Sequence, residues 1–223
     1  IMCNCILGIS VAIAVISSTL QCLGQFAWSV LSIMGYMCHL RLAVPKGDND
    51  LIYNVTFTFY KTYLYDPESC VDAGHINYAS YLRPHVHNVE ELTPPYQVFG
   101  WVLSLLALNT LWMLTTLLLL IAICSVKRKL MVPWLIVTFL VSLFDLAAGV
   151  TFGFDVFKAY EMFEQGYLPE DTILPAALLT GLFFRGGLFW LTNLILNMFI
   201  LRAYRQAPTD SSPMKEYRSV ATS

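Results

Sequence analysis

The stretch VFGWVLSLLALNTLWMLTTLLLLIAICSV, residues 98–126, contains no charged residue. A helix crosses the ~30 Å hydrocarbon core of a bilayer with about 20 apolar residues, so this stretch is long enough to span a membrane. The whole chain has the same character, because 57% of its 223 residues are hydrophobic and 13% are charged. Soluble domains contain about 25% charged residues. The sequence therefore predicts an integral membrane protein, and its net charge of −2 argues against a nucleic-acid partner.

Three further apolar runs complete a pattern of four membrane spans. The first run extends over residues 6–40, which is too long for the ~7–15 residue core of a signal peptide and indicates a retained anchor. We expect an all-α membrane protein. Its predicted parts are an N-terminus with span one (1–42), an outer loop (43–97), span two (98–126), an inner loop (127–130), span three (131–153), a second outer loop (154–172), span four (173–201) and a tail (202–223).

The distribution of charge predicts the orientation of these spans. Lys127-Arg128-Lys129 lies between spans two and three, and basic residues beside a span favour the cytosolic side. The loop at 43–97 holds three basic and seven acidic residues, and the loop at 154–172 holds one and five. Both loops are therefore expected outside the cytosol, with both termini cytosolic. Asn54-Val55-Thr56 is an N-glycosylation pattern in the larger outer loop, which agrees with this orientation.

The larger outer loop carries two further signals. Residues 54–65 read NVTFTFYKTYLY, whose β-branched and aromatic residues in rough alternation predict a strand. A strand needs a partner, and residues 77–82 are the candidate. Cys70 lies in this loop and Cys38 lies near the outer end of span one, so these two residues form either a disulfide or two free thiols.

Two charges fall deep inside the apolar spans. Asp145 lies fourteen residues past Met131, or ~21 Å along a helix, and Arg185 lies sixteen residues before Leu201, or ~24 Å. An isolated charge at such depth is costly, ~2.5–3.5 kcal/mol on insertion scales. Because the two depths agree and a short loop joins the spans, we expect Asp145 and Arg185 to form an ion pair.

Neutral polar residues are predicted at the same depth. Gln21 in span one and Asn109 in span two would form a polar layer with the pair. Such residues either fix helix packing through hydrogen bonds of ~0.6–2 kcal/mol or belong to a proton- or solute-handling site. Gly149 and Gly153 form a GxxxG pattern, which lets helices approach closely.

Motifs for chemistry are absent from the sequence. It contains no GxSxG, HExxH, P-loop or GxGxxG pattern, and the outer-loop histidines lack a third ligand at metal-binding spacing. We therefore expect a protein that is not an enzyme and needs no cofactor or metal. In the tail, Tyr217-Arg-Ser-Val220 fits a short sorting motif that could add as a strand to a clathrin-adaptor subunit.

The segment from Arg128 to Leu135, RKLMVPWL, carries a family resemblance. Its basic residues followed by Pro-Trp-Leu resemble the entry to the third span in insect four-span proteins that include the pasiflora proteins. The order of outer and inner loops is also similar. More distantly, Leu143-Phe144-Asp145 resembles the third span of the lysosome-associated four-span family. Claudins share the four spans, but their outer-loop Trp and two-Cys signature is absent.

The resemblance to the pasiflora family implies a non-enzymatic role in assembling septate-junction-like contacts at the plasma membrane, with other membrane or junction proteins as partners. The lysosome-associated likeness implies trafficking to endosomal or lysosomal membranes. The alternative is a small transporter, or an accessory subunit of one, that uses the Asp145/Arg185 pair.

Overall fold

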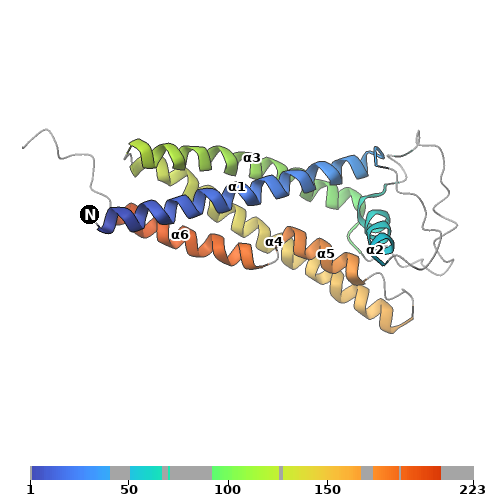
Figure 1. Cartoon of the computed structure of the whole chain (residues 1–223). Helices are drawn as coiled ribbons and strands as arrows, with labels where there is room; N and C mark the ends of the chain where they lie inside the picture. Colours follow the sequence, from blue (N-terminus) through green and yellow to red (C-terminus); the bar gives the residue numbers. More distant parts are fainter. Residues whose placement is uncertain are drawn as a thin grey trace, which may run out of the picture. The chain divides into compact units, whose positions relative to one another are not determined.

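The computed structural model describes residues 2–40, 51–66, 70, 92–125, 128–166, 173–185 and 187–206. These residues form helices joined by turns, and no strand occurs among them. The helices are α1 (Met2–Tyr36), α2 (Leu51–Phe59), the π-helix η1 (Tyr60–Leu64), α3 (Pro95–Ser125), the short 3-10 helix η4 (Arg128–Leu130), α4 (Met131–Glu164), α5 (Ile173–Phe183) and α6 (Leu188–Gln206) (Figure 1).

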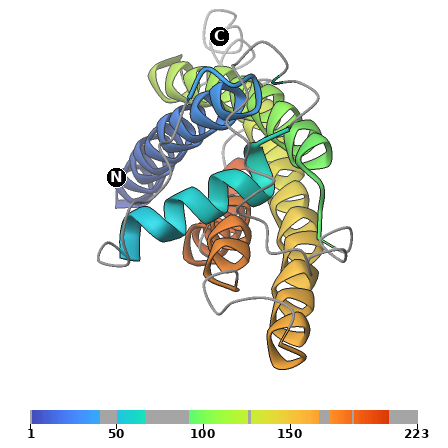
Figure 2. The same ribbon diagram turned by 90° about the vertical axis from the view of Figure 1, so that its right-hand side faces the viewer.

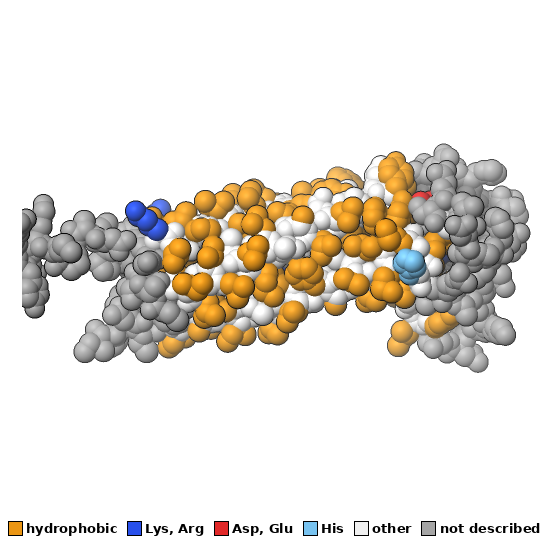
Figure 3. Space-filling model, turned by 90° about the horizontal axis from the view of Figure 1, so that it is seen from above, with side chains coloured by type: hydrophobic (Ala, Val, Ile, Leu, Met, Phe, Trp, Pro, Cys, Tyr) orange, Lys and Arg blue, Asp and Glu red, His pale blue; other side chains and the backbone are white. Residues whose placement is uncertain are grey.

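Four helical stretches are long and apolar enough to cross a membrane, which confirms the predicted number of spans: Ile9–Tyr36, Pro95–Ala122, Met131–Glu164 and Ile173–Arg202. Large apolar side chains on them are exposed, including Leu20 (65%) and Phe157 (69%). Figure 3 shows hydrophobic side chains spread over the face in view, with few charged side chains on its described part. A soluble protein rarely exposes so much contiguous apolar surface, so the chain is an integral multi-pass membrane protein.

The chain divides into two compact units. Unit 1 comprises Ile1–Leu23, Leu108–Ser142 and Leu191–Ser223, and unit 2 comprises Gly24–Ala107 and Leu143–Trp190. Helices α1, α3, α4 and α6 each contribute residues to both units.

Unit 1 contains neutral polar pairs between its helices. Gln21 of α1 and Asn193 of α6 exchange two hydrogen bonds, with N···O distances of 3.0 and 2.9 Å. The Trp112 indole N–H of α3 donates to the Thr138 hydroxyl of α4 at 2.9 Å. Each of these four residues is at most 8% exposed. These two buried polar pairs of unit 1 are thus bonded across helices.

Unit 2 has an aromatic core. Phe152 of α4 stacks on Phe183 of α5, with ring centroids 4.6 Å apart. Trp101 of α3 packs against Phe144 and Phe152 of α4 at 5.1 and 6.0 Å. The second half of α4 therefore packs beside α5, as Figure 1 also shows. Such ring pairs contribute about 0.5–1.5 kcal/mol each beyond their buried area.

The predicted strand at 54–65 is wrong, because this segment is helical in α2 and η1. Val55, Phe57 and Phe59 are all buried, as are the η1 residues Tyr60, Tyr63 and Leu64. Residues 55, 59 and 63 share one face of a helix through their spacing of four. This face packs inward, and α2 crosses against α5 (Figure 2). Packing therefore overrides a β propensity that depends strongly on context. The proposed partner strand at 77–82 lies outside the described residues.

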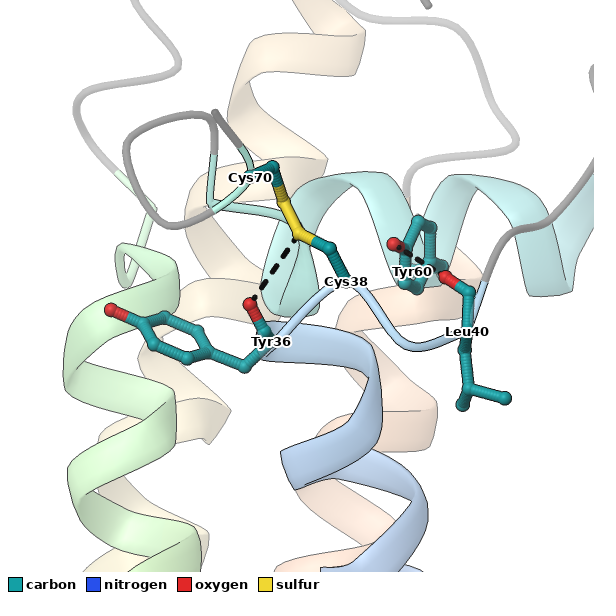
Figure 4. The surroundings of a disulfide bond; sticks show 5 residues. All are labelled: Tyr36, Cys38, Leu40, Tyr60 and Cys70. Carbon is teal, nitrogen blue, oxygen red and sulfur yellow. Dashed lines mark hydrogen bonds between the residues drawn. A yellow bond between two sulfur atoms is a disulfide. The ribbon is translucent and has the colours of Figure 1, made fainter. Parts of the chain in front are cut away.

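A disulfide joins Cys38, just after α1, to Cys70 beyond η1 (Figure 4). Their Cα atoms are 5.6 Å apart, within the usual range for a disulfide. Cys38 has φ +60°, and two hydrogen bonds, from His39 N to Met34 O and from Cys38 N to Gly35 O, end α1 in a Schellman motif. The Tyr60 hydroxyl donates to Leu40 O at 2.9 Å. We call α2, η1 and this disulfide the cap.

Two spans differ from their predicted extents. Helix α4 continues to Glu164, so residues 154–164, predicted as loop, are helical, and Gly166 with φ +74° follows the helix end. Span four was predicted as one helix over 173–201, but the structure contains two, α5 and α6.

Candidate functional site

Two buried charges of unit 2 form an ion pair. Arg185 Nε donates to Asp145 Oδ2 at 2.6 Å, and the two side chains are 2% and 0% exposed. The structure thus brings together the two charges that sequence depth placed at one level. Pairing offsets part of the free-energy cost of burying each charge. Removing one partner leaves the other as a buried charge without a counter-ion.

Arg185 lies where span four is interrupted. Residues 184 and 185 follow the end of α5, and α6 begins at Leu188 (Figure 1). Arg185 has φ +52° and Gly187 has φ +71°. A left-handed residue commonly ends a helix, but this position is usually glycine, and a side chain there costs about 1–2 kcal/mol. The turn therefore aims the guanidinium at α4 from a backbone conformation that arginine disfavours.

The ring of Phe184 fills a space that Gly149 leaves on α4. A Cβ placed on Gly149 would lie 2.9 Å from Phe184 Cδ2, and one on Gly187 would lie 3.3 Å from Phe184 Cε1. Asp145 and Gly149 are four residues apart and so share one face of α4. This face receives both residues of the turn: Asp145 binds Arg185, and Gly149 accommodates Phe184.

Gln25 of α1 bonds to the backbone just before the turn. Its amide Nε2 donates to the Leu182 carbonyl at 3.1 Å. The last four carbonyls of a helix have no partner within that helix, and unsatisfied backbone groups are costly in a membrane. Thr180 O is bonded by Phe184 N at 2.8 Å, so Gln25 satisfies a second of these carbonyls. We call Asp145, Arg185, Phe184, Gly149 and Gln25 the break site.

The other predicted residues of the polar layer belong to unit 1. Gln21 pairs with Asn193 and also donates to the Ser17 hydroxyl at 3.0 Å. Asn109 is fully buried, and its backbone carbonyl accepts from Cys22 Sγ at 3.8 Å. Of the two predicted packing glycines, Gly149 is in close contact. A Cβ on Gly153 would meet no atom within 4 Å.

Sequence reasoning missed several of these residues. Asn193 is one of two amides in an apolar run, with Asn197 four residues later. An amide in such a run is the same signal that identified Asn109. Asp155 falls in the outer loop predicted at 154–172, but it is 2% exposed and accepts from Thr93 N at 3.1 Å. Burial and the nearby Asp155 carboxylate raise the pKa of Tyr63 in the cap. Nothing in the sequence linked Gln25 to a helix end.

The remaining predicted sites lie in the cap or beyond the described chain. Cys38 and Cys70 are joined, as described above. Asn54 is half-buried on α2, and the Thr56 hydroxyl of the same pattern donates to Ile52 O at 2.8 Å. Tyr217 and Val220 lie outside the described residues. No group of three metal-ligating side chains occurs within the part of the chain that the structure describes.

Comparisons with protein-family models, curated proteins and solved structures found no match to this chain.

Proposed function

We propose that this chain is a non-enzymatic multi-pass protein whose cap acts as a recognition element at a cell surface or junction. The observation that carries the proposal is the attachment of the cap to α1 and the residues just after it, within unit 2. A disulfide, the Tyr60 bond to Leu40 and the contact of Trp28 with Phe59 at 5.6 Å all fix it in place. A rigid surface binds a partner without first having to become ordered.

The orientation proposed for the cap follows from three features. Disulfides persist in oxidising compartments and are rare in the cytosol, so Cys38 and Cys70 favour an extracytosolic cap. The Asn54 glycosylation pattern lies in the same segment. The basic residues at 127–129 favour the opposite side for the loop between α3 and α4. The tail is then cytosolic, where Tyr217-Arg-Ser-Val220 could engage an adaptor.

The surface of α2 offers a place for contact with a neighbouring protein. Ile52 is 80% exposed, the highest value among the large apolar side chains of the described residues. Apolar anchors on rigid elements dominate many protein interfaces. In this proposal the partner is another membrane or junction protein, and the lipid bilayer surrounds the exposed apolar faces of the four spans.

The test is the localisation of the tagged full chain in a polarised epithelium, compared with an Ile52→Glu variant and a Cys38→Ser/Cys70→Ser variant. We expect lateral-membrane enrichment of the parent chain and its loss in both variants while membrane insertion persists. Cys22→Ser is the matched cysteine control, because Cys22 is buried and outside the disulfide. Uniform surface distribution of the parent chain would contradict the junction role, and accumulation in acidic vesicles that Tyr217→Ala abolishes would replace it with trafficking.

A second candidate function, transport, is favoured by the break in span four. Transporters build their sites from discontinuous helices at mid-membrane, where freed backbone groups and charged side chains meet the solute. Intramembrane Asp and Arg residues often belong to ion or proton paths. Proteoliposomes with an internal pH indicator test this candidate. A proton flux that Asp145→Asn abolishes without loss of folded protein would support transport, and a flux equal to that of empty liposomes would exclude proton coupling.

A further inference from the structure

One face of α1 in unit 2 carries a run of polar residues. Gln25, Ser29 and Ser32 recur at spacings of four and three, so they lie on the same side of the helix. Trp28 is adjacent to Ser29 on this side. Ser29 is 0% and Ser32 is 1% exposed, whereas Val30 and Leu31 between them are 49% and 52% exposed. We call Gln25, Trp28, Ser29 and Ser32 the polar row.

The polar row connects two features already described. At one end, Gln25 bonds to Leu182 O in the break site. Toward the other end, Trp28 packs edge-on against Phe59 of the cap, and a Cβ on Gly35 would lie 3.3 Å from Leu64 Cδ1. The row thus extends along α1 from the break site toward the cap.

Every residue of the polar row has a buried atom without a hydrogen-bond partner among the described residues: Gln25 Oε1, Trp28 Nε1, Ser29 Oγ and Ser32 Oγ. Asp145 Oδ1 of the break site and Tyr63 Oη of the cap share this property. More than about 90% of buried polar groups in native proteins are bonded to protein or to ordered water. Four exceptions within two turns of one helix therefore indicate a bound polar ligand.

The chemistry of these atoms identifies the ligand class. Gln25 Oε1 and Asp145 Oδ1 accept, Trp28 Nε1 donates, and the hydroxyls do both. A cation would leave the indole N–H unsatisfied, and an anion would be repelled by the carboxylate. A small neutral molecule with donors and acceptors satisfies all of them. Water bridges groups up to ~5.6 Å apart with two bonds of ~2.8 Å, which matches the ~5.4 Å between successive helical turns.

We propose that the polar row binds a file of water molecules that extends from the cap side toward the Asp145/Arg185 pair. The water would donate to Asp145 Oδ1, so the ion pair would lie at the end of a hydrated path and not in a dry interior. This inference does not rest on the proposed function, because a hydrated row is compatible with either recognition or transport.

Cysteine accessibility tests the proposal in the full chain reconstituted in lipid nanodiscs. The background variant keeps the disulfide and carries serine in place of Cys3, Cys5, Cys22 and Cys124. Ser29→Cys or Ser32→Cys is added to this background, and each protein is treated with a small charged methanethiosulfonate. Modification is followed by intact mass. The thiolate is the reactive species and forms only where water is present. Val30→Cys is the lipid-facing control, and Val102→Cys is the control for a buried apolar site, being 0% exposed in the parent.

We expect Ser29→Cys and Ser32→Cys to be modified at least about tenfold faster than both controls, because only hydrated thiols ionise. Rates equal to that of Val102→Cys, with full modification of all four variants after denaturation, would overturn the proposal.

Alanine variants give a second measurement that does not depend on a reactive thiol. If water bonds the hydroxyls, Ser29→Ala and Ser32→Ala lose those bonds and their melting temperatures fall. If the hydroxyls are dry and unbonded, alanine removes a buried unsatisfied group and the melting temperatures rise, which would contradict the water file. Ser104→Ala is the control, because Ser104 is exposed and bonds only along its own helix to Gly100 O.

Discussion

The two units contain buried polar groups of different kinds. In unit 1, the Gln21 and Asn193 amides bond to each other between α1 and α6 at a point where both helices are continuous. In unit 2, the Asp145/Arg185 pair is charged, and it lies where span four is broken. Amide pairs contribute modestly to helix association and need no distortion. A charged pair is expensive in a membrane and indicates a functional site, so unit 2 is where function is expected.

The largest loss of folding stability should come from breaking the ion pair. Arg185→Gln leaves the Asp145 carboxylate buried without its cation, and Asp145→Asn leaves the guanidinium without its anion. Each should destabilise the protein by about 3–5 kcal/mol, the cost of removing one partner of a buried pair. The double variant should recover much of this loss. Thermal unfolding in detergent measures all three, and a double variant no more stable than the worse single variant would refute the coupling.

A smaller loss of folding stability is expected from Gly149→Ala. The new Cβ would lie 2.9 Å from the Phe184 ring, and such overpacking costs about 1–3 kcal/mol. Gly153→Ala is the matched control on the same helix, because its Cβ would meet no atom within 4 Å, and it should change stability by no more than about 0.5 kcal/mol. Adding Phe184→Leu should relieve the Gly149→Ala defect. Equal melting temperatures for the two alanine variants would show that Phe184 does not need this space.

The smallest loss of folding stability is expected from removing the amide pair of unit 1. Gln21→Leu and Asn193→Leu each remove the amide pair and should cost about 0.6–2 kcal/mol, the range for hydrogen bonds between membrane helices. The double leucine variant should approach the stability of the parent, because no unpaired amide remains. The same unfolding assay checks this expectation. A loss for Asn193→Leu as large as that for Arg185→Gln would remove the contrast between the two units.

Span number and charge depth could be predicted from the sequence because both depend on regular geometry. A helix rises ~1.5 Å per residue, so counting from the span ends placed Asp145 and Arg185 at one level. The break in span four was missed because counting assumes a continuous helix. Phe184-Arg185-Gly186-Gly187 contained a signal for it, a glycine pair beside a charge, but the apolar flanks indicated an unbroken span.

Residues 54–65 and the end of α4 were predicted wrongly for other reasons. Residues 54–65 have strand-like composition, and only their tertiary contacts select a helix. Acidic residues after Gly153 were taken to end span three. Charge indicates where a membrane ends, but a helix can continue past that point, and α4 reaches Glu164. Gly153 was assigned to close packing by its GxxxG spacing alone, which does not specify the neighbour that would fill the space.

The contacts of Phe184 and Arg185 with α4 define a sequence pattern by which related chains can be recognised. Two positions on span three, an aspartate and a glycine four residues later, accommodate two neighbouring residues of span four. The arrangement can be written as D-x-x-x-G opposite F-R-x-G, which are short patterns separated by a variable connection. Chains too divergent to align over their full length can still be searched for this combination. Those that carry it are expected to interrupt their fourth span at the same arginine.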